Sequence, residues 1–424
     1  MATGGLKRTW RNSACLILAC GAFKYNTRPL LRNSLQAVNP AFTPVCLQDL
    51  KTPTTTRDKL EFLLVKRSDV SSFMPSNHVF PGGVLDPADF APQWLTLFDS
   101  CAGPHPFASI PGLGTPLPTR PPLYNSLPSG SAVPGEVAFR ICAIREVFEE
   151  AGILLARDHR DAPGNSGLMA GSFAPAVKQL PLPLMEEWRD KIHNNALEFV
   201  NLCRELHCVP DIWSLVEWST WLTPRNFHKR FDTIFYLCCS ETKLEVCTDK
   251  KEVFDAQWLG PEGIMENSHI TVAPPQAAEF HKFHRLGSPS SVHSFGLWQS
   301  LHGLVPIYRP VRIKTKDNII MSVLDDDDLY PLEVSEYQPP EGIQHHPQAE
   351  AIRDTVHLVT TNHMMYEYKV PTHTAKELHD CSRQTMRFEF GAPIMPVVGA
   401  FEKKQAEHEL RYRQSLQECT NSKL

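Results

Sequence analysis

Three glutamates lie within one five-residue stretch of the sequence, in the segment AIREVFEEAG over residues 143–152. If this segment is helical, at about 100° per residue, Glu146, Glu149 and Glu150 share one side as i, i+3 and i+4 neighbours. Like charges at this spacing destabilise a helix. A hard cation such as Mg²⁺ takes carboxylate oxygens and would relieve the repulsion, which makes the three glutamates candidate metal ligands. The alternative is an amphipathic helix with a solvated acidic face.

The helix that must carry these glutamates is predicted over residues 136–151, and Gly152 is a typical stop. The side opposite the glutamates is apolar and is formed by Val137, Ile141, Ile144, Val147, Phe148 and Ala151. Short apolar runs predict buried strands at 12–20 and 60–67. Further strands are expected at 214–222, 231–239, 252–258, 353–362 and 363–370. HVFPGGVLD (78–86) predicts a strand that ends in a Gly-Gly turn, and further helices are expected at 184–206, 275–285, 293–302 and 399–417.

Between the Gly-Gly turn and the acidic helix lies a proline-rich segment. Residues 104–134 hold nine prolines and little periodic pattern. Such a composition predicts a mobile surface loop. An insertion of this kind costs little where it enters between a loop and a helix. The turn and the helix are therefore expected to meet in space in spite of it.

The acidic segment, with its Arg-Glu pair, apolar Val147, Glu-Glu pair and Gly152, resembles the second half of a Nudix box. The family pattern is G-x5-E-x7-R-E-U-x-E-E-x-G-U, in which U is apolar. FPGGVLDPADF (80–90) resembles the first half, with Asp89 at the position of the family's first Glu. Arg145 follows Asp89 by 56 positions, so about 48 additional residues split the box.

This split box resembles one branch of the family, the nucleoside diphosphate-linked moiety X motif 19 group. The similar stretches are LLVKRS and HVFPGGVLD before the insertion, AFRICAIREVFEEAGILL after it, and then WSTWLTP, RFDTIFYLC, EVFDAQWLGPEGI, APPQ and DDDDLYP. The resemblance implies a Nudix α/β/α sandwich, with a mixed sheet between helices. We expect a Nudix hydrolase domain over residues 10–300, an insertion at about 91–134, and a C-terminal extension over 301–421.

The resemblance implies hydrolysis of the diphosphate of coenzyme A and acyl-coenzyme A, giving adenosine 3′,5′-bisphosphate and (acyl-)4′-phosphopantetheine. Mg²⁺ or Mn²⁺ would neutralise the diphosphate and help to activate water. The resemblance makes Glu146, Glu149 and Glu150 metal ligands, one of them also a candidate general base. It also makes Arg145 the residue that holds these carboxylates by salt bridges.

Other residues of the site follow from the same resemblance. Gly82 and Gly83 would let backbone groups approach the metal and the phosphate closely. Asp89 is shorter than the family's Glu, which puts its role as an outer ligand in question. Glu252, at the start of a predicted strand, is a candidate for an additional catalytic carboxylate against a plain surface position.

The stretch before the turn bears on the substrate. Coenzyme A-cleaving Nudix enzymes carry L-L-T-x-R-(S-x3)-R-x3-G-x3-F-P-G-G, and LLVKRS (63–68) stands at the matching distance. Ser72 replaces the second Arg of that pattern and Ser76 replaces its Gly. Lys66 and Arg67 could meet the 3′-phosphate or the diphosphate of coenzyme A. The alternative is a strand end with exposed basic residues.

Two other functions remain open at this stage. One is cleavage of NADH or ADP-ribose, although the stretch after Ile153 holds neither the S-Q-P-W-P-F-P sequence of the NADH enzymes nor the proline of the ADP-ribose enzymes. The other is a Nudix-fold binding module that has lost turnover, which the split box and Asp89 would suit. The intact Arg145 and three glutamates argue against such a module.

The composition narrows the class of protein. The chain has 424 residues and a net charge of −5, which argues against a nucleic-acid partner. No apolar run is long enough to span a membrane. The 12 cysteines show no framework pattern and suggest reduced thiols. A zinc site at Cys203, His207 and Cys208 is a weaker alternative. The run Asp325–Asp328 is expected to be a solvated acidic loop.

Both ends of the sequence resemble targeting signals. Ser422-Lys423-Leu424 is a peroxisomal import tripeptide, which implies an import receptor as partner and the peroxisome as location. The first 48 residues are basic and hold no acidic residue, which resembles a weak mitochondrial presequence. The preferred interpretation of these residues is a basic start of the first domain. The mitochondrion is kept as a second candidate location.

Overall fold

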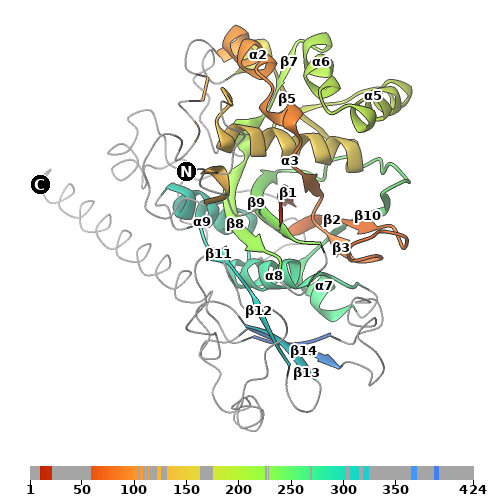
Figure 1. The fold of residues 1–424 in the computed structure, drawn as a ribbon, viewed down its shortest axis with the longest axis vertical. Helices are drawn as coiled ribbons and strands as arrows, with labels where there is room; N and C mark the ends of the chain where they lie inside the picture. The colour runs from red at the N-terminus through yellow and green to blue at the C-terminus, as the bar shows by residue number, and fades with distance from the viewer. Residues whose placement is uncertain are drawn as a thin grey trace, which may run out of the picture.

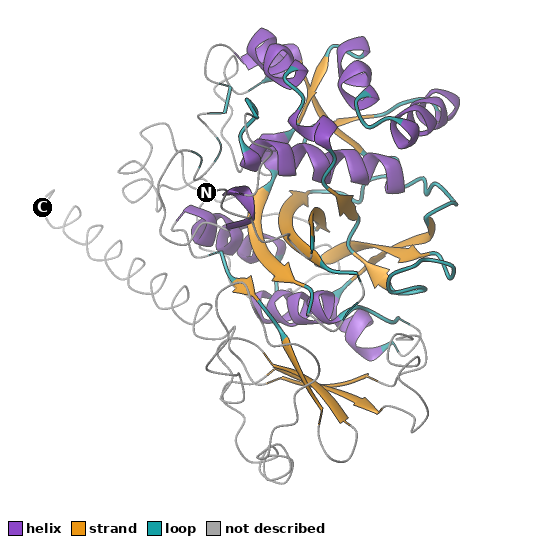
Figure 2. Ribbon diagram, in the orientation of Figure 1, coloured by secondary structure: helices purple, strands orange, loops and turns teal. Residues whose placement is uncertain are grey.

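A computed structural model of the chain shows an α/β/α sandwich with a smaller C-terminal sheet beside it (Figures 1 and 2). The structure describes residues 10–21, 59–102, 106–107, 110, 113, 122–125, 131–162, 175–224, 227, 229–267, 270–301, 305–314, 319–323, 364–369 and 386–390. The expected fold class, an α/β Nudix sandwich with a mixed sheet between helices, is confirmed.

The central sheet runs in the order β10-β2-β1-β9-β8-β11, with β3 paired to β2 and β4 paired to β1. Its strands are β1 (Arg11–Cys20), β2 (Glu61–Arg67), β3 (His78–Val79), β4 (Gly82–Val84), β8 (Val216–Leu222), β9 (Phe231–Ser240), β10 (Val253–Leu259) and β11 (Ile307–Tyr308). In its centre β1 lies parallel to β9 over ten residue pairs, whereas β2 and β4 are antiparallel to β1. The sheet is therefore mixed, as predicted.

Alternation along the strands divides the core into two layers, because successive side chains point to opposite faces of a sheet. From β1, Leu16 and Leu18 belong to the layer that contains α3 (Gly135–Ala151). Ile17 and Ala19 belong to the layer that contains α8 (Pro274–Leu286) and α9 (Pro289–Leu301). Figure 1 shows α3 on one side of the sheet and α8 with α9 on the other.

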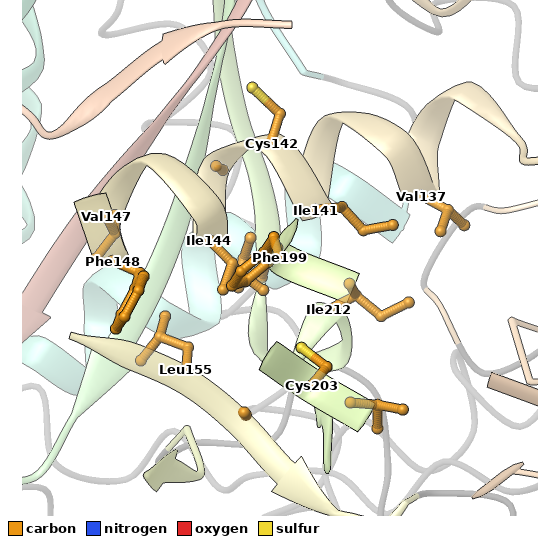
Figure 3. Packing of buried hydrophobic residues seen from close by; sticks show 14 of the residues in the cluster. Val137, Ile141, Cys142, Ile144, Val147, Phe148, Leu155, Phe199, Cys203 and Ile212 are labelled. Atoms are coloured by element: carbon orange, nitrogen blue, oxygen red, sulfur yellow. The ribbon is translucent and has the colours of Figure 1, made fainter. Parts of the chain in front are cut away.

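Helix α3 occupies the centre of the first layer (Figure 3). Its apolar residues pack against β5 (Leu154–Asp158) and α6 (Glu198–Glu205), for example Phe148 against Phe199 with ring centroids 6.4 Å apart. Gly152 ends the helix in the left-handed conformation, and its N–H donates to the Phe148 carbonyl. The predicted helix and its stop are confirmed, and the apolar side predicted from the sequence is buried throughout.

Most strands and helices expected from the sequence are present, with two differences inside the domain. The single helix expected at 184–206 is two helices, α5 (Leu182–Asn194) and α6, because Asn195 is extended at φ −154° and ψ 100°. In place of the single strand expected at 78–86 there are two short strands, β3 and β4. β3 pairs with β2, whereas β4 pairs with β1.

The prediction of a mobile surface loop at 104–134 is wrong for the residues of this segment that the structure describes. Ile110, Leu123, Tyr124 and Val133 are buried in the layer around α3. The Tyr124 hydroxyl donates to Glu217 Oε1 at 3.0 Å. Just before this segment, α2 (Gln93–Ala102) buries Trp94, Leu97 and Phe98 in the same layer. The insertion therefore supplies core, because its scattered apolar residues outweigh its prolines.

The remaining strands lie outside the central sheet. β5 pairs with β6 (Val177–Lys178) and with β7 (Cys208–Pro210). In the C-terminal extension β12 (Val311–Lys314), β13 (Ile319–Val323), β14 (Met364–Lys369) and β15 (Met386–Phe390) form an antiparallel sheet. β14 confirms the strand expected at 363–370. The expectations for residues 325–328, 353–362, 399–417 and 422–424 lie outside the described residues.

Within the described part of the chain, no helix is both long and apolar enough to cross a bilayer. The alternative zinc site is not formed in that part of the chain, where Cys203 and Cys208 are buried thiols inside the core.

The buried carboxylate of Glu279 fixes α8 to β8 of the sheet. The carboxylate of Glu279 is fully buried and pairs with Lys282 Nζ at 2.6 Å. It also accepts hydrogen bonds from Trp218 Nε1 at 2.6 Å, Ser219 Oγ at 2.7 Å and Trp221 Nε1 at 2.9 Å. The network therefore sets the position of the end of β8.

Glu279→Gln keeps the shape of this side chain and leaves Lys282 buried without its counter-charge. We expect the free energy of unfolding, measured by urea denaturation, to fall by about 3 kcal/mol. Adding Lys282→Met should restore much of the loss. Glu187→Gln, in the exposed pair with Lys191, is the matched control and should cost less than about 1 kcal/mol. A loss below that for Glu279→Gln would contradict the assignment.

Candidate active site

The guanidinium of Arg145 joins the two halves of the split box. It donates from Nε to Asp89 Oδ1 at 3.0 Å and from Nη2 to Asp89 Oδ2 at 3.1 Å. Its Nη1 donates to Glu146 Oε1 at 2.9 Å and to Glu149 Oε1 at 2.7 Å. The two halves therefore meet in space, 56 positions apart. Asp89 is buried, and both of its carboxylate oxygens accept hydrogen bonds from Arg145. Its role here is therefore structural: it positions the arginine that holds the helix carboxylates.

The Gly-Gly turn packs directly against the glutamates. The N–H of Gly82 donates to Glu150 Oε2 at 2.9 Å, and Gly82 has a φ of +152°. A Cβ at Gly82 would overlap Ala14 O and meet Cys15, while a Cβ at Gly83 would overlap the carboxylate of Glu146. Glycine is therefore required at both positions, because a side chain there would displace the glutamates or the central strand.

Burial makes these carboxylates costly to ionise without a further cation. It raises the pKa of Glu146 to about 7, although the Arg145 charge opposes the shift. Burial also raises the pKa of Glu149, and it raises that of Glu150 well above its ordinary value with the help of the Glu146 charge. The guanidinium of Arg145 pairs with three carboxyl groups and Glu150 lies beside them, so a divalent cation would offset much of the surplus negative charge.

The donor set fits a hard divalent ion in chemistry and charge. Carboxylate oxygens are the ligands that Mg²⁺ and Mn²⁺ prefer. Within the described residues, however, no three such side chains already converge on one point. Glu146 and Glu149 are turned toward Arg145, and Glu150 toward the Gly82 N–H. Side-chain rotation of these glutamates is therefore part of any metal binding here.

A cavity of about 480 Å³ opens beside the acidic helix. Its acidic lining includes Glu146, Glu149, Glu150 and Glu252, so the candidate extra carboxylate faces the same space. Its basic lining consists of Arg11, Arg67, Arg189, Lys229 and Lys251. Aromatic side chains, including Phe73, Trp221, Phe227 and Phe231, line the remainder. Such a cavity can hold an anionic ligand that also has an apolar part.

Of the two basic residues predicted for substrate, the structure brings only Arg67 to the cavity. Arg67 Nη2 donates to Ser71 Oγ at 2.9 Å and its Nε to the Phe73 carbonyl at 3.1 Å. Lys66 is not among the lining residues, because adjacent side chains of β2 point to opposite faces. Lys66 sits next to His78 on the paired strand β3 instead.

Arg189 and Lys229 are among the residues of the site that the sequence interpretation missed. Arg189 of α5 is buried and donates to the Glu149 carbonyl and, at 2.9 Å, to the Cys247 carbonyl, which anchors the end of α3. Lys229 Nζ donates to Ser72 Oγ at 2.5 Å at the rim of the cavity. Neither lies in a motif with a characteristic spacing, so only the fold brings them to the site.

Comparison with known proteins agrees with this geometry. The family model described as the NUDT19 Nudix domain matches residues 10–283. The human protein named acyl-coenzyme A diphosphatase NUDT19 is 36% identical over 341 residues, which cover 77% of this chain and 82% of the relative. The Xenopus laevis protein of the same name is 38% identical over 280 residues, 64% of this chain and 71% of the relative.

Among solved structures, a Nudix hydrolase from Alicyclobacillus acidocaldarius is 16% identical with a TM-score of 0.43, covering 67% of this chain and 96% of that one. The family match spans most of the described core and both halves of the split box. This chain therefore belongs to the NUDT19 family of Nudix hydrolases, enzymes that hydrolyse acid anhydrides.

Proposed function

We propose that this enzyme hydrolyses the diphosphate of coenzyme A and acyl-coenzyme A. The products are adenosine 3′,5′-bisphosphate and 4′-phosphopantetheine or its acyl form. One observation carries the proposal: a single cavity holds the acidic helix, basic side chains and an aromatic wall. The names of the human and Xenopus laevis relatives support the same substrates.

Within this proposal Glu146, Glu149 and Glu150 hold Mg²⁺ or Mn²⁺, which Nudix hydrolases generally require. When bound, the ion supplies charge neutralisation for the diphosphate and a more acidic water. Arg145 keeps the carboxylates at the helix surface through the hydrogen bonds described above. One of these glutamates is also the candidate general base that would accept a proton from this water.

The basic and aromatic side chains of the cavity can bind the remaining parts of the substrate. Arg67 faces the cavity near Glu150, where it can contact the diphosphate through charge-assisted hydrogen bonds. Phe73 packs edge-on against Phe231 with centroids 5.1 Å apart, and both line the cavity. Their faces and edges provide an apolar surface for the adenine ring of the substrate. The catalytic domain of the proposal spans residues 10–300.

The proposal extends to location. The tripeptide Ser422-Lys423-Leu424 supports the peroxisome and an import receptor as partner, with the mitochondrion as a second site. These residues lie outside the described part of the chain. We expect a fluorescent protein fused before residue 1 to give peroxisomal puncta in cells. Deleting the tripeptide should make the signal diffuse, and unchanged puncta would contradict this role.

A substrate panel tests the proposed reaction against its alternatives. With the purified chain in Mg²⁺, free, short-chain and long-chain acyl-coenzyme A should yield adenosine 3′,5′-bisphosphate, detected by chromatography. NADH and ADP-ribose should yield little AMP. Preferential AMP release from NADH or ADP-ribose would support the alternative diphosphatase, and no turnover of any compound would support a binding module.

Glu150→Gln tests the metal assignment, because it removes one charge at nearly constant shape. We expect the release of adenosine 3′,5′-bisphosphate from coenzyme A at saturating Mg²⁺ to fall by about a hundredfold or more. Chelation of Mg²⁺ should abolish it. Glu186→Gln, at an exposed position of α5, is the control and should leave the rate unchanged. A Glu150→Gln rate within twofold of the original chain would rule out the assignment.

A further inference from the structure

The five basic side chains that line the cavity differ in what already binds them. Lys251 Nζ pairs with Asp190 at 2.7 Å. Arg189 is committed to the carbonyls of Glu149 and Cys247. Arg11, Arg67 and Lys229 have no carboxylate partner within the described residues. These three are therefore the cations available to an anionic ligand.

The three available cations lie at the same end of the central strands β1, β2 and β9. Arg11 is the first residue of β1, and Lys229 lies two positions before Phe231, which is the partner of Arg11 in β9. Arg67 ends β2, which runs antiparallel to β1. The loop that follows Arg67 connects the set, because Arg67 donates to Ser71 and Lys229 donates to Ser72. One short loop thus holds two of the cations in place.

Arg67 is half-buried, whereas Arg11 and Lys229 are exposed at the mouth of the cavity. Arg67 interacts electrostatically with the Glu150 carboxylate, so under the proposed function it lies on the side of the metal and the diphosphate. Lys229 is exposed at the rim, and its hydrogen bond to a neutral hydroxyl leaves its charge unneutralised. Arg11 is also exposed and adjoins it through the β1–β9 pairing.

We infer that Lys229, together with Arg11, forms a subsite for a second, separate phosphate of the substrate, the 3′-phosphate of the adenosine half of coenzyme A. This inference rests on the proposed function. A monoester phosphate has nearly two negative charges, so two cations without carboxylate partners suit it. NADH and ADP-ribose have a diphosphate and no such group. The rim cations therefore select coenzyme A compounds among nucleoside diphosphate derivatives.

The test compares coenzyme A with 3′-dephospho-coenzyme A, which both yield 4′-phosphopantetheine on hydrolysis. We expect Lys229→Ser to raise KM for coenzyme A about tenfold with little change in kcat, because the contact is the same in ground and transition states. KM for 3′-dephospho-coenzyme A should stay within twofold. Lys191→Ser is the control, since that exposed lysine is paired with Glu187 and lies outside the cavity lining, and it should leave both KM values unchanged.

A relocated charge gives a stricter test. Ser72 Oγ lies 2.5 Å from Lys229 Nζ, so an arginine at position 72 can reach the same space. We expect Ser72→Arg to restore the low KM for coenzyme A in the Lys229→Ser background. A merely structural role of Lys229 would not be rescued in this way. Equal loss of activity toward both substrates in Lys229→Ser would overturn the inference.

Direct binding separates this inference from the proposed reaction. By calorimetry the original chain should bind adenosine 3′,5′-bisphosphate about tenfold more tightly than AMP, and Lys229→Ser should remove that preference. If neither coenzyme A compound is hydrolysed, the proposed function fails, and this binding preference still decides the subsite. Equal binding of the two nucleotides by the original chain would overturn the subsite while leaving the diphosphatase proposal intact.

Discussion

The arrangement of the site depends on how buried negative charge is balanced around α3. Arg145 hydrogen-bonds to Asp89 from the first half of the box and to Glu146 and Glu149 from the second. Without that guanidinium, four carboxyl groups would face one another in a region that water hardly reaches. The same side chain therefore assembles the site and leaves three of the four carboxyl charges unbalanced. Under the proposed function, a divalent ion would offset most of this negative charge.

The split box shows that a functional motif need not be continuous in sequence to be continuous in space. Gly82 and Gly83 pack on Glu150 and Glu146 although the insertion separates them. The insertion also contributes contacts to the core beneath α3. Tyr124 reaches under α3 to Glu217, which also pairs with the buried Arg140 of α3 at 3.3 Å. The inserted segment thus supports the far end of the helix that carries the glutamates.

Periodicity predicted the parts of the fold that repeat a simple pattern. The short apolar run of β1 and the apolar side of α3 were sufficient, because each pattern directly indicates which side chains are buried. The sequence could not reveal features that depend on tertiary neighbours. Asn195 breaks a helix whose composition is otherwise continuous. Lys66 and Arg67 are adjacent in sequence, yet only the sheet determines which of them faces the cavity. Lys229 reaches the site only because β9 starts beside β1.

The parallel pairing of β1 with β9 has a consequence for synthesis of the chain. Ser13 and Thr233, which share a hydrogen bond between these strands, are 220 positions apart. A ribosome therefore releases the apolar strand β1 long before its central neighbour exists. Until about residue 240 has emerged, that strand has an open edge, which favours aggregation or capture by chaperones. The cavity, which both strands line, can form only after this late pairing.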